Sequence, residues 1–203
     1  MNFKQEIMNH ELSDSNEEYI MKNGTIPIIL TAVHTMQQHK KNRIKKSEPF
    51  TKAIAKYVAE QVNCSYYIKL KDNKIDSNSL ETDEFKNNLL DYIVGNNIKL
   101  LIDIHGADCN RDFDVEIGTL NNLSAAYSTI KELGEAFIET GIKNIRFNDP
   151  FKGGGITQFI YANTDIDIIQ IEINRKYRDY NNSDNIEKIC QSLINFINQY
   201  NNR

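Results

Sequence analysis

Two histidines and one glutamate stand at the ends of apolar runs, and these side chains are the ones best suited to chemistry. Residues 26–33, 98–104 and 166–171 lead into His34, His105 and Glu172, respectively. Apolar runs bounded by polar segments are typical of buried strands. In an open α/β sheet, ligands bind outside the carboxyl ends of the strands. The pattern therefore predicts two imidazoles and a carboxylate at one sheet edge, which are the parts of a catalytic metal site.

The neighbours of these residues follow the period of a strand. Asp103 stands two residues before His105, so both side chains lie on one face, where the carboxylate can orient the imidazole or join the ligands. Glu172 shares a face with Gln170 and Asn174, a pattern that a half-exposed antiparallel strand would also show. Beside two histidines, Glu172 is better explained as a general base, because burial near a metal tunes the pKa of a carboxyl.

The elements that would position these side chains alternate along the chain. Helical spacing predicts helices over 50–62, 81–94, 123–140 and 183–200. Further strands are predicted at 65–70 and 142–147, with a candidate edge strand at 114–119. This order predicts one α/β domain over 1–203, with a central mixed, mostly parallel sheet flanked by helices on both faces. Residues 1–22 are polar and give no clear assignment.

Composition excludes several classes of protein. The net charge of −4 over 203 residues argues against a nucleic-acid binder, which would show a basic stripe. Three scattered cysteines make no disulfide framework, and neither a signal peptide nor an apolar run of membrane-spanning length is present, so we expect a cytoplasmic protein. The basic run at residues 40–46 fits a solvated loop or an anion-attracting lip beside the site.

The sequence resembles N-formylglutamate amidohydrolases, which are relatives of the zinc-carboxypeptidase-like hydrolases. The resemblance spans residues 27 to about 180. It rests on His34, on the run LLIDIHG at 100–106, on segments 112–119 and 148–154, and most specifically on QIEINR at 170–175. It implies the fold of those hydrolases and a zinc site made of His34, an acidic residue at position 37, and His105. Position 37 is Gln37, a poorer zinc ligand than a carboxylate, so other third ligands stay open: His39, Asp103, Cys109 and Glu116.

The resemblance also implies an activity, the zinc-dependent hydrolysis of the amide in a small N-acyl amino acid or a peptide-like substrate. Glu172 would act as general base on the attacking water. Substrates of this family carry a carboxylate, for which a guanidinium is the natural partner. Arg111 is the first choice for this role in catalysis, and Arg43 and Arg175 are the alternatives. In the glycine-rich loop 151–155, Lys152 and Gly154 are expected to contact the substrate.

A second interpretation is a non-catalytic small-molecule-binding protein that kept the fold and lost the metal. Gln37 favours this alternative, whereas the retention of His34, His105 and Glu172 together favours the enzyme. A divalent metal other than zinc also fits, because affinity order alone does not set which metal a protein holds.

Overall fold

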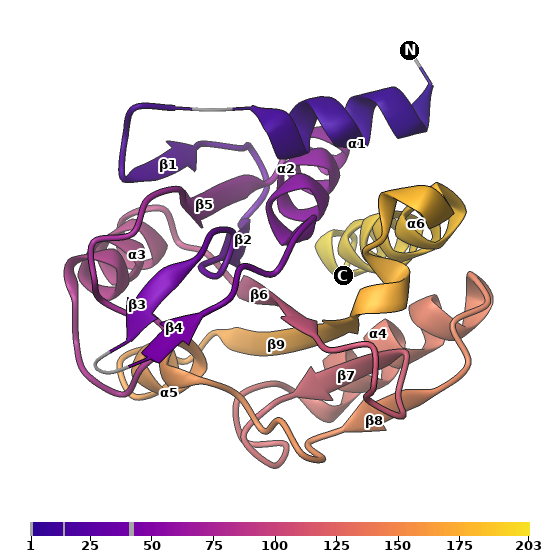
Figure 1. The fold of residues 1–203 in the computed structure, drawn as a ribbon. Helices are drawn as coiled ribbons and strands as arrows, with labels where there is room; N and C mark the ends of the chain where they lie inside the picture. Colours follow the sequence, from indigo (N-terminus) through magenta and orange to yellow (C-terminus); the bar gives the residue numbers. More distant parts are fainter. Residues whose placement is uncertain (1, 14, 41–42) are drawn as a thin grey trace.

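A seven-stranded sheet forms the centre of the protein (Figure 1). The computed structural model describes residues 2–13, 15–40 and 43–203, apart from the side chains of residues 39, 40 and 43. The strand order is β1-β5-β2-β6-β9-β7-β8. The strands of this sheet are β1 (Tyr19–Lys22), β2 (Ile28–Ala32), β5 (Ser65–Lys69), β6 (Leu100–Ala107), β7 (Val115–Gly118), β8 (Ile145–Phe147) and β9 (Asp167–Asn174).

Strands β5, β2, β6 and β9 pair in parallel, as do β7 and β8, whereas β1 pairs with β5 and β7 pairs with β9 in the antiparallel sense. The predicted mixed, mostly parallel sheet is confirmed. Every residue of β2 is buried, as the continuous apolar run indicated for a strand covered on both faces.

Helices cover both faces of this sheet. One face carries α1 (Phe3–Leu12), α2 (Thr51–Val62), α4 (Tyr127–Glu139) and α6 (Ser183–Asn201), and the other carries α3 (Glu84–Gly95) and α5 (Gly155–Tyr161). Side-chain alternation divides the strands between the two cores, so that Ile102 and Ile104 enter the first core and Leu101 enters the second. Within the described ranges, none of the helices combines the length and apolar character needed to cross a bilayer.

The strand predicted at 114–119 lies elsewhere in the sheet than expected. It forms β7, which lies between β9 and β8, so β8 and not β7 is the edge strand on this side of the sheet. The alternation Val115-Glu116-Ile117 resembles that of a half-exposed strand, because a charged residue stands between two apolar ones. Glu116 is nonetheless fully buried, with its Oε1 accepting a hydrogen bond from the backbone N–H of Phe151.

Two segments without an assigned element do contain regular structure. The segment between His34 and Glu48 holds a separate hairpin of β3 (Gln38–Lys40) and β4 (Arg43–Lys45). Residues 1–22 supply α1 and β1. Both segments are short and largely polar, so neither shows the periodicity on which sequence-based assignment depends. Lys41 and Asn42 of the predicted basic run lie outside the described residues.

Candidate metal centre

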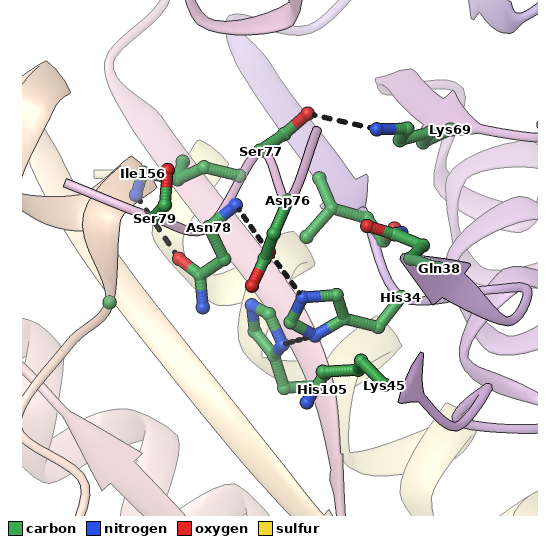
Figure 2. Close-up of polar contacts among 12 residues, drawn as sticks. His34, Gln38, Lys45, Lys69, Asp76, Ser77, Asn78, Ser79, His105 and Ile156 are labelled. Carbon is green, nitrogen blue, oxygen red and sulfur yellow. Dashed lines mark hydrogen bonds and ion pairs between the residues drawn. The ribbon is translucent and has the colours of Figure 1, made fainter. Parts of the chain in front are cut away.

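Three donor side chains converge at the carboxyl ends of β2 and β6: His34, Glu48 and His105, all buried. His34 Nδ1 lies 3.0 Å from Glu48 Oε1 and 3.1 Å from His105 Nδ1, and His105 Nδ1 lies 3.4 Å from Glu48 Oε2. Figure 2 shows the two imidazoles side by side. Ligand atoms around a tetrahedral zinc ion, with bonds of about 2.0–2.2 Å, are separated by about 3.3 Å. The spacing of these donors therefore fits a divalent cation.

The far nitrogen of each imidazole is held by a carboxylate. His34 Nε2 is 2.9 Å from Asp76 Oδ1, and His105 Nε2 is 2.9 Å from Asp103 Oδ2. The Thr31 hydroxyl donates to Asp103 Oδ1 at 2.7 Å and fixes that carboxylate in turn. In the tautomer in which each Nε2 donates its hydrogen to a carboxylate, both Nδ1 atoms are left as acceptors on the side of Glu48. Such carboxylate–histidine pairs are typical of histidines that bind metals.

Three carboxylates around two imidazoles draw positive charge into this cluster. Burial alone would raise the pKa of Glu48, but the two imidazoles outweigh it and hold that pKa well below its usual range. Burial alone would lower the pKa of His105, but Asp103 and then Glu48 outweigh it and hold that pKa well above its usual range. A proton meets this demand when no metal is bound, and a divalent cation can replace it, because metal binding to such donors releases protons.

Parallel neighbouring strands place the two histidines, and a loop brings the third donor to them. Glu48 follows the β3–β4 hairpin and stands just before α2. Its backbone N–H donates to the His34 carbonyl at 2.8 Å, and its Oε2 accepts the Gly106 N–H at 2.9 Å. The donors contributed by β2, by β6 and by the hairpin connection are thus hydrogen-bonded into one unit.

Glu172 lies beside this unit without joining it. It is directly opposite His105 in the β6–β9 pair, and it lines the same cavity of about 930 Å³ as the three donors. Burial raises the pKa of Glu172 to about 7, against the opposing effect of His105. Gln170 Nε2 donates to Glu172 Oε1 at 3.1 Å, and Gln170 Oε1 accepts the Gly154 N–H at 2.6 Å. A carboxyl of this pKa at a cavity wall is suited to accept and return a proton.

The third donor beside the histidines is Glu48, where the sequence analysis placed Gln37. Gln37 is exposed and does not line the cavity. Its neighbour Gln38 is the buried glutamine, and its Nε2 donates to the Val33 carbonyl just before His34. The carboxylate that lies beside the two imidazoles does not follow His34 by three residues, because the β3–β4 hairpin separates His34 from Glu48. The sequence offered one signal that could have pointed to Glu48: it is an acidic residue directly before Pro49 and a predicted helix.

The arginines considered for the substrate are in different environments. Arg175 is exposed and lines the cavity. Arg111 is exposed and does not line it, and its guanidinium lies 5.1 Å from the centre of the Phe151 ring, which does line it. The side chain of Arg43 lies outside the described part of the chain, so its role stays a prediction.

Lysines and the glycine-rich loop complete the cavity wall. Lys152 and Gly154 line the cavity, and their contact with a substrate stays a prediction. Lys45 also lines it, with its Nζ 2.8 Å from Glu48 Oε1. The sequence analysis did not single out Lys45, because nothing in a basic run distinguishes the lysine that turns inward.

The segment that carries Asp76 is braced by two fully buried lysines, Lys69 and Lys86. Lys69 Nζ donates to the Ile75 carbonyl at 2.5 Å, and Lys86 Nζ donates to the Glu81 carbonyl at 2.5 Å. Figure 2 shows Asp76 pointing at His34 from this segment. Sequence reasoning missed Asp76, since the residue has no spacing relationship to either histidine.

These features define an α/β fold with a histidine–carboxylate cluster at the carboxyl edge of its sheet. No protein-family model and no curated protein sequence matches the chain. Solved structures do share the fold. N-formylglutamate amidohydrolase from Ralstonia eutropha JMP134 superposes with a TM-score of 0.71 at 12% identity, over 92% of this chain and 98% of that one.

Two further structures of similar fold have different activities in their names. Bacteriophage poly-gamma-glutamate hydrolase gives a TM-score of 0.63 at 12% identity, over 93% of this chain and 92% of that one. The metallo-carboxypeptidase from Burkholderia cenocepacia gives 0.52 at 11% identity, over 90% of this chain and 61% of that one. The predicted resemblance to N-formylglutamate amidohydrolases and zinc carboxypeptidases is therefore confirmed for the fold.

Proposed function

We propose that this chain is a metal-dependent amidohydrolase whose metal is zinc, held by His34, Glu48 and His105. The proposal rests on the convergence of these three donor atoms in one cavity. The same cavity is lined by Glu172, an acid that is not one of the donors. Three protein ligands with an open position are typical of catalytic zinc, whereas structural zinc sites are closed by four. The activities named for the proteins of similar fold support the same reaction class.

Glu172 is the general base of the proposed reaction. A divalent cation at the donor cluster would activate water and polarise the amide carbonyl. Glu172 takes a proton from the attacking water and then delivers it to the departing amine nitrogen, so one carboxyl serves in both steps. Its Gln170 hydrogen bond holds the carboxylate in place for this transfer. Lys45 supplies a positive charge at the cavity wall, where negative charge develops on the carbonyl oxygen.

The substrate class follows from the charges at the cavity mouth. Among the described residues that line the cavity, three exposed cations, Lys46, Lys152 and Arg175, outnumber one exposed acid, Asp108, although the protein as a whole carries a net charge of −4. This local excess favours a substrate with one or more carboxylates beside the amide. An acidic N-acyl amino acid, of the kind named for the Ralstonia protein, meets this requirement, and so does a short chain of acidic residues.

The non-catalytic binding protein remains the rival. It was favoured by Gln37, and that support disappears once Glu48 is taken as the third ligand. A purely binding site would also have no need for a buried acid of near-neutral pKa next to the donors.

A substrate panel with a chelator control tests the proposed function. Purified protein is assayed against N-formyl, N-acetyl and peptide-linked glutamate, alongside the corresponding neutral amides. We expect hydrolysis of a carboxylate-bearing member, loss of activity after dialysis against a chelator, and recovery with Zn²⁺. Hydrolysis that is unaffected by the chelator would exclude the proposed metal chemistry.

A further inference from the structure

Arg178 is a buried arginine that contacts three separate segments of the site. Its Nε donates to the Ile173 carbonyl at 2.9 Å, one Nη donates to the Pro49 carbonyl at 2.6 Å, and the other donates to the Ala107 carbonyl at 3.0 Å. Only 2% of this residue is exposed. A planar guanidinium offers donors in fixed directions, so its bonds fix the positions of the groups that accept them.

Each of these carbonyls belongs to a segment that carries a residue of the proposed site. Pro49 follows Glu48, Ala107 stands two residues after His105, and Ile173 follows Glu172. These segments come from the hairpin connection, from β6 and from β9, and Arg178 is 129 residues away from Pro49 in sequence. Arg178 thus connects the loop that carries one proposed metal ligand to two adjacent strands. These strands carry a second proposed ligand and the proposed general base.

The absence of a side chain at Gly106 leaves room for the Arg178 guanidinium. A Cβ atom on Gly106, the residue after His105, would lie 2.3 Å from Arg178 Cζ. Gly106 donates its N–H to Glu48, so any shift of this residue also reaches the third donor. Glu48 and Glu172 interact electrostatically with Arg178 and favour its charged form against the effect of burial.

We infer that Arg178 is a positioning residue, which sets the relative placement of Glu48, His105 and Glu172 and thereby sets both metal affinity and rate. This inference rests on the proposed function. Arg178 also lines the cavity, but the role inferred here rests on its three bonds to backbone carbonyls and not on contact with the substrate. Arg175, three residues earlier, is the exposed arginine of the cavity and has a separate role.

The test measures Zn²⁺ affinity by competition with a chromophoric chelator, for the wild type and for Arg178→Lys. Lysine keeps the charge but cannot reach three carbonyls from one nitrogen. We expect at least a ~10-fold loss of Zn²⁺ affinity, the magnitude found when groups that orient metal ligands are removed. The Co²⁺-substituted variant should show an altered visible spectrum, which reports ligand geometry directly. In the assay, kcat should fall while KM stays within about two-fold, as for lost positioning rather than lost binding.

Two further variants separate positioning from general stability. Leu193→Ala removes a fully buried side chain of α6 from the larger core, on the face of the sheet opposite to the side chains of His105 and Glu172, and it should lower the melting temperature without changing Zn²⁺ affinity. In Gly106→Ala, the added methyl group would displace the Arg178 guanidinium. This variant should therefore show the affinity loss expected of Arg178→Lys, even if the lysine variant does not fold. Because both variants disturb one contact, their combined effect should be less than additive.

The possible failures are distinguishable. If the wild type binds Zn²⁺ and both site variants bind it equally well, with only the melting temperature lowered, Arg178 is structural and this inference is overturned while the proposed function stands. If the wild type itself binds no Zn²⁺, the proposed function and this inference fail together.

Discussion

Glu172 lies opposite His105, in register, in the parallel β6–β9 pair, and the two side chains are hydrogen-bonded to different neighbours. His105 is hydrogen-bonded to Asp103 and Glu172 to Gln170, and Asp103 and Gln170 are themselves register partners two residues earlier in the two strands. Two adjacent strands therefore present an imidazole and a carboxyl from one face, each with its own hydrogen-bond partner. In the proposed function these would be a metal ligand and a general base, so metal binding and proton transfer can be tested separately.

The general base is tested by Glu172→Gln. The amide keeps the size of the side chain but cannot accept a proton, so kcat should fall by at least ~100-fold, within the range of general acid–base catalysis. Zn²⁺ content should be unchanged, because Glu172 is not one of the three donors. Glu139→Gln, at an exposed position of α4, is the matched control and should leave the rate intact. Turnover at the wild-type level in Glu172→Gln would remove this residue from the mechanism.

The third metal ligand is tested by comparing Glu48→Gln with Gln37→Ala. Glutamine keeps one side-chain oxygen but loses the negative charge of one of the three donors, so Zn²⁺ affinity should fall by at least ~100-fold. Gln37 is exposed and away from the cavity, so its truncation should change affinity by less than about two-fold, as for an ordinary surface substitution. The opposite ranking, measured by chelator competition, would restore the assignment of position 37.

The pH dependence of kcat/KM should have an acidic limb. Burial raises the pKa of Glu172 to about 7, and a base must be ionised to accept a proton. The rate should therefore fall as the pH drops through this range and the carboxyl becomes protonated. A bound divalent cation favours the carboxylate, so the midpoint should lie at or below about 7. A rate that increases towards acid would contradict a carboxylate base.

Recognition of the substrate carboxylate is tested by Arg175→Ala and Arg111→Ala. Arg175 lines the cavity, so its removal should raise KM for a carboxylate substrate about 10-fold or more, with a much smaller effect on the neutral amide analogue. Arg111 packs over Phe151 outside the cavity and should have the weaker effect. A larger effect at Arg111 would return it to the role that the sequence analysis preferred.

The sequence predicted the elements that build the centre of the fold. The apolar runs before His34, His105 and Glu172 correspond to β2, β6 and β9, because buried parallel strands need continuous apolar side chains. The amphipathic spacing at 183–200 corresponds to α6, whose inner face is buried in the larger core. These signals are local, so they can be detected without a structure.

The residues that sequence reasoning missed reach the site through loops. Glu48 follows the β3–β4 hairpin, Asp76 lies on a segment held by buried lysines, and Arg178 lies just after β9 and contacts the end of β6. None has a fixed spacing to a histidine, since tertiary hydrogen bonds place them. The cytoplasmic location and the extent of the domain stay predictions, because neither follows from the geometry of the described residues.

The central claim is that His34, Glu48 and His105 hold a divalent cation, and direct metal analysis tests it best. Protein purified without a histidine tag, resupplied with Zn²⁺ and desalted, should contain about one equivalent of zinc, as one catalytic site requires. The His105→Ala variant, if it keeps the wild-type circular dichroism spectrum, should contain almost none. Wild-type protein that retains no zinc after resupply, or an equal zinc content in His105→Ala, would contradict the claim.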